Sequence, residues 1–203
     1  MPLELDVHVT KDLKVIVCHD SELKRVTGKE GIIEDLTYAY IRNHYRLLDG
    51  EMIPSFKEVL DLIQERVPIV CELKVYKRNY KILAQKVKEE LKVIKDKKNI
   101  SLISFDPRAL FPFKHDGFSR VLLIASSRQD VLLFRNAFDG LDIEYNLLRQ
   151  PKVMKYAQTH FMNAWTIQDE EAYQYALGYC DTMTFQHLDP DKITQGLKEH
   201  PLE

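Results

Sequence analysis

Residues 100–125 read ISLISFDPRALFPFKHDGFSRVLLIA, and this stretch decides the fold class. Its two ends, 100–105 and 121–125, are short runs of mostly apolar residues, as expected of strands that are buried on both faces. Between them, Asp106 and Pro107 are typical of the N-cap and first turn of a helix. A strand, a helix and a second strand in this order predict a βα unit, whose strands lie parallel in one sheet.

The same alternation continues on both sides of this stretch. Further strands are predicted at 3–10, 68–73, 141–145, 161–167 and 181–185, and helices at 77–97, 128–138 and 151–159, with others that begin at Ser55, Asp169 and Asp189. A strand at 15–19 follows the first so closely that the two must form an antiparallel hairpin. Residues 20–50 show no clean period and are interpreted as an irregular part of an insertion that covers about residues 11–52.

A barrel accounts for this alternation better than an open sheet. The chain has only 7 glycines and no glycine-rich phosphate-binding turn, which open nucleotide-binding sheets carry after their first strand. We therefore predict an α/β fold of the TIM (β/α)8 type, formed by residues 1–203 as a single domain. In such a barrel the functional site lies at the carboxyl ends of the strands.

Composition excludes several classes of function. The 203 residues are 45% hydrophobic and carry a net charge of -2, with no basic field that would bind nucleic acid. Apolar runs reach about five residues, far short of the ~20 of a transmembrane segment. Cys18, Cys71 and Cys180 lie in apolar runs without zinc-site spacing, so we interpret them as buried thiols of a reduced, cytoplasmic protein. The first residues show no signal-peptide features, and a signal peptide upstream of Met1 stays open.

Charged side chains gather on the predicted strands. Glu4 and Asp6 are two residues apart on one strand, Glu72 and Lys74 are two apart at the end of another, and His19 ends the hairpin. Three carboxylates at one mouth would repel each other unless a hard divalent cation lies among them, and oxygen ligands favour Mg²⁺ or Ca²⁺. Lys74 would suit a phosphate, and His19 would suit proton transfer.

Each of these pairs has an ordinary structural explanation when it is taken alone. Glu4 and Asp6 fit the solvent-facing side of a strand, Glu72 and Lys74 fit an exposed ion pair, and His19 with Asp20 fits a surface turn. The cluster becomes informative because all of these groups fall at the same end of successive predicted strands.

The order of these motifs resembles the glycerophosphodiester phosphodiesterase family. The matching segments are ELDV at 4–7, TKD at 10–12, VIVCHD at 15–20, IPS at 53–55, CELK at 71–74, ISFDP at 103–107 and NAWTIQD at 163–169. They cover nearly the whole chain, in the family's order.

The resemblance implies a TIM-barrel phosphodiesterase that cleaves glycerophosphodiesters into glycerol 3-phosphate and an alcohol such as choline. The family holds one divalent cation, Mg²⁺ or Ca²⁺, through three carboxylates, which correspond to Glu4, Asp6 and Glu72. His19 would act in general acid–base transfer, Lys74 would contact the phosphate, and Trp165 would line the pocket for the glycerol or alcohol part.

The sequence departs from the family pattern at its start. The family begins with a strand that bears His-Arg-Gly, which supplies a second histidine and a phosphate-binding arginine, and no His-Arg pair occurs here. We therefore expect a barrel that lacks its first strand and helix, with impaired hydrolysis. Its edges at 3–10 and 181–185 would be unpaired, which predicts an unstable, oligomeric or aggregation-prone chain. Leu13 replaces a turn glycine, and His8 is interpreted as a mouth or hairpin residue.

Three interpretations remain open at this stage. The first is an enzyme of this family whose sequence has lost its start, which the intact carboxylates favour. The second is an inactive fragment, or a remnant of the same fold that binds metal or phosphate. The third is an unrelated barrel enzyme of the phospholipase C type, which matches Glu72, Lys74 and Trp165 less well.

Overall fold

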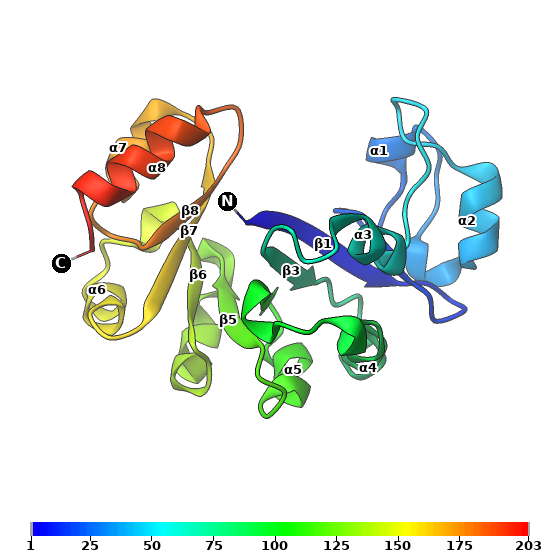
Figure 1. The fold of residues 1–203 in the computed structure, drawn as a ribbon, viewed down its shortest axis with the longest axis horizontal. Helices are drawn as coiled ribbons and strands as arrows, with labels where there is room; N and C mark the ends of the chain where they lie inside the picture. Colours follow the sequence, from blue (N-terminus) through cyan, green and yellow to red (C-terminus); the bar gives the residue numbers. More distant parts are fainter. Residues whose placement is uncertain (1, 203) are drawn as a thin grey trace. The chain divides into compact units, whose positions relative to one another are not determined.

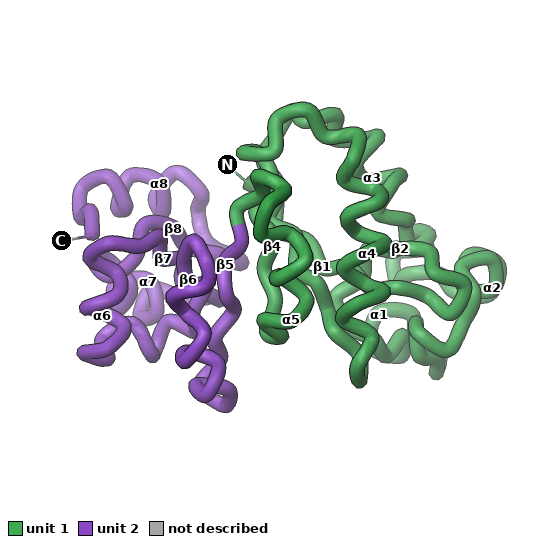
Figure 2. Tube along the Cα trace, turned by 90° about the horizontal axis from the view of Figure 1, so that it is seen from below, with its two compact units in different colours: residues 1–119 green, residues 120–203 purple. Residues whose placement is uncertain are grey.

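Parallel strands separated by helices make up most of the chain, as the alternation in the sequence predicts (Figure 1). The structure is a computed structural model that describes residues 2–202. The chain divides into two compact units, residues 1–119 and 120–203, which Figure 2 shows in different colours. Each unit contains both strands and helices.

Unit 1 is built on four strands in the order β2-β1-β3-β4. The strands are β1 (Leu3–Val9), β2 (Val15–Val17), β3 (Ile69–Leu73) and β4 (Ile100–Ser104). The helices are α1 (Lys24–Thr27), α2 (Tyr38–His44), α3 (Phe56–Ile63), α4 (Tyr80–Glu90) and α5 (Pro107–Leu110), with 3₁₀ turns η1 (Ile33–Asp35), η2 (Leu91–Val93), η3 (Lys97–Asn99) and η4 (Phe111–Phe113). β1 and β2 form the predicted antiparallel hairpin, whereas β3 is parallel to both β1 and β4.

The pairing of β1 corrects one expectation. Val7 to Val9 pair with β2, while Leu3 to Val7 pair with β3, so the strand has neighbours on both sides along part of its length. The expectation that the predicted strand 3–10 presents an unpaired edge is therefore wrong for Val7–Val9. The hairpin partner covers these residues because the link between the two strands is too short to place it elsewhere.

Helix caps in unit 1 form where the sequence predicts them. The Ser55 side chain accepts from the Glu58 backbone N–H and the Glu58 carboxylate accepts from the Ser55 N–H, which completes a capping box at α3. Asp106 caps α5 by accepting from the N–H of Arg108. The predicted helix at 77–97 is shorter, because Lys77 has a left-handed φ of 53° and α4 begins only after this turn.

The segment 20–50 is more ordered than its pattern indicates. It contains α1, η1 and α2, and it is drawn mainly in light blue and cyan in Figure 1. Its apolar residues pack on β2 in a small core of their own. The buried members of this core are Ile16, Cys18, Leu23, Ile33, Ile41, Tyr45 and Ile53. Helices this short carry little intrinsic stability, so this core holds them in place.

Leu13 adopts the left-handed backbone conformation that its turn requires, which costs free energy. It sits in the β1–β2 turn with φ 65°, a left-handed value that strains any residue with a Cβ, and its side chain is largely exposed. We expect Leu13→Gly to raise the free energy of unfolding by up to about 1 kcal/mol, less the entropy that glycine loses on folding. Urea unfolding checks this, and a clear loss of stability would show that the Leu13 side chain is needed for packing.

Unit 2 holds four parallel strands in the order β5-β6-β7-β8. The strands are β5 (Ser119–Ile124), β6 (Gly140–Glu144), β7 (Phe161–Ile167) and β8 (Thr182–Phe185). The helices are α6 (Pro151–Ala157), α7 (Glu170–Ala176) and α8 (Pro190–Glu199), with 3₁₀ segments η5 (Ser126–Ala137) and η6 (Tyr145–Leu147). The α-helix predicted at 128–138 is instead η5, interrupted at Arg128, whose φ of -131° is not helical.

A buried polar cluster crosses the strands of unit 2. Asn163 of β7 donates from Nδ2 to Asp142 Oδ1 of β6 (2.6 Å) and to Thr184 Oγ1 of β8 (2.9 Å). Thr182 Oγ1 donates to Asn163 Oδ1 at 2.7 Å. Burial raises the pKa of Asp142 to about 7, although the Asn163 hydrogen bond opposes this rise.

The raised pKa of Asp142 predicts a dependence of stability on pH. Because its folded-state pKa lies above the unfolded value, the stability that it contributes is present below about pH 4 and is lost as the pH rises to about 7. Asp142→Asn cannot ionise. Its free energy of unfolding should therefore gain on that of the wild type by about 1.4 kcal/mol per pH unit through this window and by no more above it.

Urea unfolding of both proteins at several pH values checks the Asp142 prediction. Asp130, whose side chain is 72% exposed in the same unit, supplies the control Asp130→Asn. A difference between Asp142→Asn and wild type that stays constant from pH 4 to 8 would contradict the prediction.

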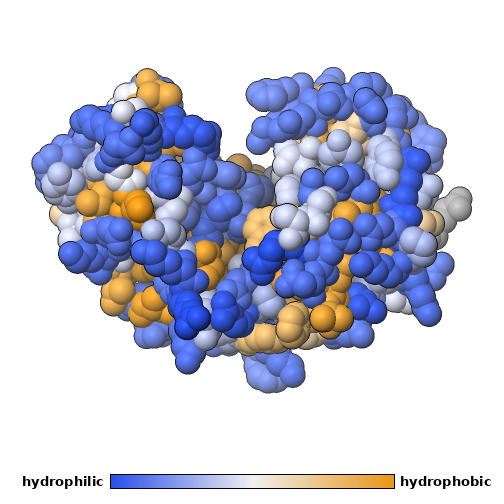
Figure 3. Space-filling view, turned by 180° about the vertical axis from the view of Figure 1, so that it is seen from behind, coloured by the Kyte–Doolittle hydropathy of each residue, from blue (hydrophilic) through white to orange (hydrophobic). Residues whose placement is uncertain are grey.

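The three cysteines are buried and free, as predicted, and burial raises the pKa of the Cys180 thiol to about 12. Hydrophilic residues cover most of the surface in view in Figure 3, and apolar residues are interspersed among them. Among residues 2–202, every helix is too short or too polar to cross a bilayer.

Candidate active site

Three carboxylates from two neighbouring strands meet in unit 1. The parallel register places Asp6 of β1 opposite Glu72 of β3, and Glu4 lies on the same face of β1 as Asp6. One carboxylate oxygen from each residue lies within 4.8 Å of the others. Asp6 and Glu72 are buried, whereas Glu4 is exposed. The structure therefore brings together all three predicted metal ligands.

Lys74 joins this carboxylate cluster. Its Nζ lies 3.2 Å from Asp6 Oδ1 and 3.2 Å from Glu72 Oε1. Its backbone N–H donates to the carbonyl of Val7 on β1 at 3.1 Å, which fixes the position where the side chain leaves β3. Burial by itself lowers the pKa of Lys74, but the charges of Glu72 and Asp6 outweigh it, so the pKa is raised and the ammonium keeps its charge.

Burial and the neighbouring charges shift the pKa of Glu72. Burial raises the pKa of Glu72 to about 8, the charge of Lys74 opposes this rise, and the charge of Asp6 adds to it. With every group ionised, the three carboxylates and one ammonium have a formal charge of -2. Oxygen donors at this spacing and charge fit a hard divalent cation such as Mg²⁺ or Ca²⁺.

His19 follows β2 and is held by its neighbour in the sequence. Its Nδ1 lies 2.6 Å from Asp20 Oδ1, and Asp20 also forms an ion pair with Arg25. The hydrogen bond from Arg25 lowers the pKa of Asp20 to about 2, so Asp20 is a carboxylate that only accepts. His19 Nδ1 must then carry a proton, which leaves Nε2 to exchange protons with a substrate. The His19 side chain is 64% exposed, so a substrate has access to it.

Several residues around His19 were not predicted as part of the site. Two of them are Arg25 and Glu34. Arg25 donates to the Asp20 carboxylate, and Glu34 contacts His8 and Ser21. Arg25 comes shortly after His19 and Asp20 in the sequence. A basic residue close behind a His-Asp pair was therefore a local signal that could have indicated it. Glu34 is 26 positions from its partner in an aperiodic segment, and no local pattern marks it.

Trp165 belongs to unit 2. It lies on β7 in register with Glu144 of β6, is half-buried, and donates from Nε1 to the carbonyl of Asp142 at 3.1 Å. The indole is thus fixed at its polar end, while its rings have the flat apolar surface that a pocket wall needs.

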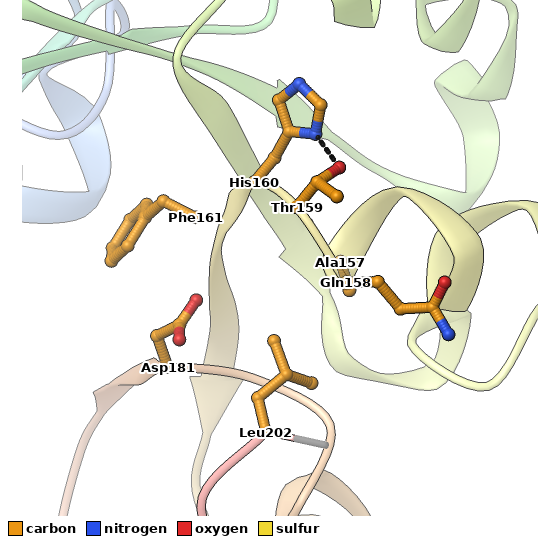
Figure 4. Close-up of a pocket in the computed structure, with 7 residues that line it drawn as sticks. All are labelled: Ala157, Gln158, Thr159, His160, Phe161, Asp181 and Leu202. Atoms are coloured by element: carbon orange, nitrogen blue, oxygen red, sulfur yellow. Dashed lines mark hydrogen bonds between the residues drawn. The ribbon is translucent and has the colours of Figure 1, made fainter.

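A separate open pocket of about 480 Å³ also lies in unit 2 (Figure 4). Its lining residues are Ala157, Gln158, Thr159, His160, Phe161, Asp181 and Leu202. Thr159 Oγ1 and His160 Nδ1 share a hydrogen bond of 2.8 Å, and Asp181 Oδ2 accepts from the N–H of Met162. These polar groups are bound to each other or to the backbone, so the pocket offers less chemistry than the carboxylate cluster.

Comparison with known proteins identifies the family of the chain. The sequence pattern of the glycerophosphoryl diester phosphodiesterase family matches residues 2–155, which include the three carboxylates, Lys74 and His19. The chain belongs to this family. The resemblance noted in the sequence is therefore confirmed.

Curated members of the glycerophosphodiester phosphodiesterase family share part of this chain. A glycerophosphodiester phosphodiesterase of Bacillus altitudinis is 29% identical over 119 residues, which are 55% of this chain and 49% of that protein. A lysophospholipase D GDPD1 of Rattus norvegicus is 38% identical over 105 residues, 46% of this chain and 32% of that protein. The matched part thus spans about half or less of these relatives.

A solved structure shares the fold over almost the whole chain. The phosphodiesterase of Oleispira antarctica, in complex with the product sn-glycerol-3-phosphate, superposes with a TM-score of 0.78 at 21% identity, covering 97% of this chain and 85% of that one. At this identity the likeness shows a common α/β fold, which agrees with the fold class that the glycerophosphodiester phosphodiesterase resemblance implies.

Proposed function

We propose that this chain hydrolyses glycerophosphodiesters, using one divalent cation held by Glu4, Asp6 and Glu72. The observation that carries the proposal is the carboxylate cluster with Lys74, formed by residues that the family pattern covers. When bound, Mg²⁺ or Ca²⁺ would polarise the phosphoryl oxygens and offset their negative charge.

The side chains of the site have distinct parts in this reaction. Lys74, which stays charged, binds a phosphoryl oxygen of the diester. Water adds to phosphorus, and the bond from phosphorus to the alcohol oxygen breaks. His19 Nε2 exchanges the proton, taking it from water or giving it to the departing alcohol, while Asp20 keeps the ring oriented. The products are glycerol 3-phosphate and a free alcohol.

The rate of this reaction is the second part of the proposal. The family's His-Arg-Gly strand supplies a further histidine and an arginine, and no such motif occurs in residues 1–203. Loss of one general acid–base group typically costs about 10²–10⁴-fold. We therefore propose that residues 1–203, which do not carry this motif, hydrolyse the diester slowly by themselves but retain cation binding.

The direct test is the release of glycerol 3-phosphate from glycerophosphocholine. A coupled dehydrogenase assay measures this release with Mg²⁺, with Ca²⁺ and with a chelator. Cation-dependent release supports the enzyme. A chain that binds the cation by calorimetry, yet releases no product, would instead be a metal-binding remnant of the same fold. A chain that does neither would exclude both functions.

A further inference from the structure

His8 links the strand of the carboxylate cluster to the segment that carries His19. It lies two residues after Asp6 on the same face of β1 and is 2% exposed. Its Nδ1 lies 2.7 Å from Glu34 Oε1, and its Nε2 lies 3.3 Å from the backbone carbonyl oxygen of His19. Both nitrogens of the ring are thus engaged by residues of another part of the chain.

The proton on the His8 ring follows from these contacts. A carbonyl oxygen only accepts, so Nε2 must carry a proton and donate it to the His19 carbonyl. Glu34 uses its other oxygen, Oε2, to accept from the hydroxyl of Ser21. Glu34 therefore holds β1 through His8 and holds the segment 19–21 through Ser21.

This pair does more than fill space. The side chains of His8 and Glu34 are 3% and 8% exposed, and burying two such polar groups costs free energy that an apolar side chain on the same strand face would not. What the pair adds is a directed contact to the His19 backbone. On the ring side, the exposed His19 is held by Asp20, its half-buried neighbour in the same segment.

We propose that His8 and Glu34 are positioning residues that fix the His19 backbone relative to the carboxylate cluster on β1. Because Asp6 and His8 belong to one strand, the cluster and the proton-transfer group are set against the same rigid element. Small displacements of a catalytic group reduce rate strongly without a matching loss of substrate binding. The inference rests on the function proposed above, for which His19 is the proton-transfer group.

Two substitutions at position 8 separate the two contacts of the ring. The amide nitrogen of Gln reaches the place of Nε2, so His8→Gln keeps a donor for the His19 carbonyl. The amide nitrogen of Asn reaches the place of Nδ1, so His8→Asn keeps the contact with Glu34 and loses the one with His19. Glu30→Gln is the matched control, because Glu30 lies close in the sequence to Glu34 and its side chain is 77% exposed.

Two readouts test the proposal in the full chain. The first is the ¹⁵N–¹H spectrum of the histidine side chains, with His160 of unit 2 as an internal reference. The second is kcat and KM for glycerophosphocholine with Mg²⁺. For His8→Asn we expect shifted and broadened His19 signals and a kcat that is lower by about tenfold or more, with KM within about twofold. His8→Gln should restore most of both, and Glu30→Gln should match wild type.

The outcomes are decisive in each case. The proposal would be overturned if the His19 signals and kcat were unchanged in His8→Asn. It would also be overturned if His8→Gln changed both as much as His8→Asn does. If wild type itself releases no product, the proposed function fails, and the spectra alone decide the positioning role. If His8→Asn does not fold, Ser21→Ala replaces it, since it removes only the Ser21 contact to Glu34, and unchanged His19 signals there overturn the proposal.

Discussion

Glu72→Gln is expected to weaken the binding of Mg²⁺ or Ca²⁺ by at least about 100-fold and to reduce glycerol 3-phosphate release by a similar factor. Loss of a group that only supports a ligand already costs about 10–100-fold in metal affinity, and Glu72 is proposed as a ligand itself. The amide keeps the shape of the side chain and its contact with Lys74 is lost or weakened. Calorimetric titration and the coupled assay measure the two effects.

The Glu72→Gln variant should remain folded. Because the pKa of Glu72 is raised to about 8, its ionisation lowers the stability of the cation-free chain as the pH rises from about 4.5 to 8, and Gln removes this loss. The matched control is Glu51→Gln, which alters an exposed carboxylate of the same unit. Unchanged cation affinity in a folded Glu72→Gln chain would show that the metal assignment is wrong.

The same pKa predicts how wild type and variant differ with pH. Below about pH 8 a cation must displace the proton of Glu72, so the cation affinity of wild type should rise by up to about tenfold per pH unit from 6 to 8 and level off above. Glu72→Gln has no such proton to release, and its residual affinity should be flatter over this range.

Gly140→Ala is expected to destabilise the chain by about 3 kcal/mol or more. Gly140 of β6 is in register with Phe161 of β7, and a Cβ built on Gly140 would lie 2.4 Å from the Phe161 carbonyl oxygen and 2.9 Å from its Cβ. A backbone oxygen in a strand ladder cannot move away as the tip of a side chain can. Accommodating the methyl group therefore requires β6 and β7 to separate locally.

Gly178→Ala provides the comparison in the same unit. Gly178 has φ 76° and nothing within 4 Å of a built Cβ, so alanine there meets backbone strain but no contact. That strain should cost about 1–2 kcal/mol. Urea unfolding of the two variants would separate the effects, and a Gly140→Ala loss no larger than that of Gly178→Ala would refute the steric argument.

Local signals in the sequence account for the elements that were predicted well. Asp106, Asp169 and Asp189 each cap a helix by accepting a backbone N–H within the first turn, an interaction that depends only on the next few residues. β7 spans Phe161–Ile167 as predicted, because a run of apolar and β-forming residues is enough to define it.

The candidate site also contains residues that the sequence predicted and residues that it did not. Glu4, Asp6 and Glu72 were predicted because two-residue spacing puts side chains on one face and parallel strands align their ends. Glu34 was not, since its contact with His8 depends on the path of the segment 20–50. Thr37 caps α2 by accepting from the Tyr40 N–H and is a local signal for that helix. The small apolar core that holds α1 and α2 has no regular period, so nothing nearby in the sequence marks Glu34.

The alternation along β1 fixes the spacing and the direction of the site residues that this strand carries. Glu4, Asp6 and His8 occupy every second position, about 6.6 Å apart along the strand, and so face the same way. Deleting or inserting one residue between Glu4 and His8 would turn one end of this series to the opposite face. Natural variation in length should therefore be tolerated in the 10–14 turn but excluded from residues 4–8, however conservative the residue that is added.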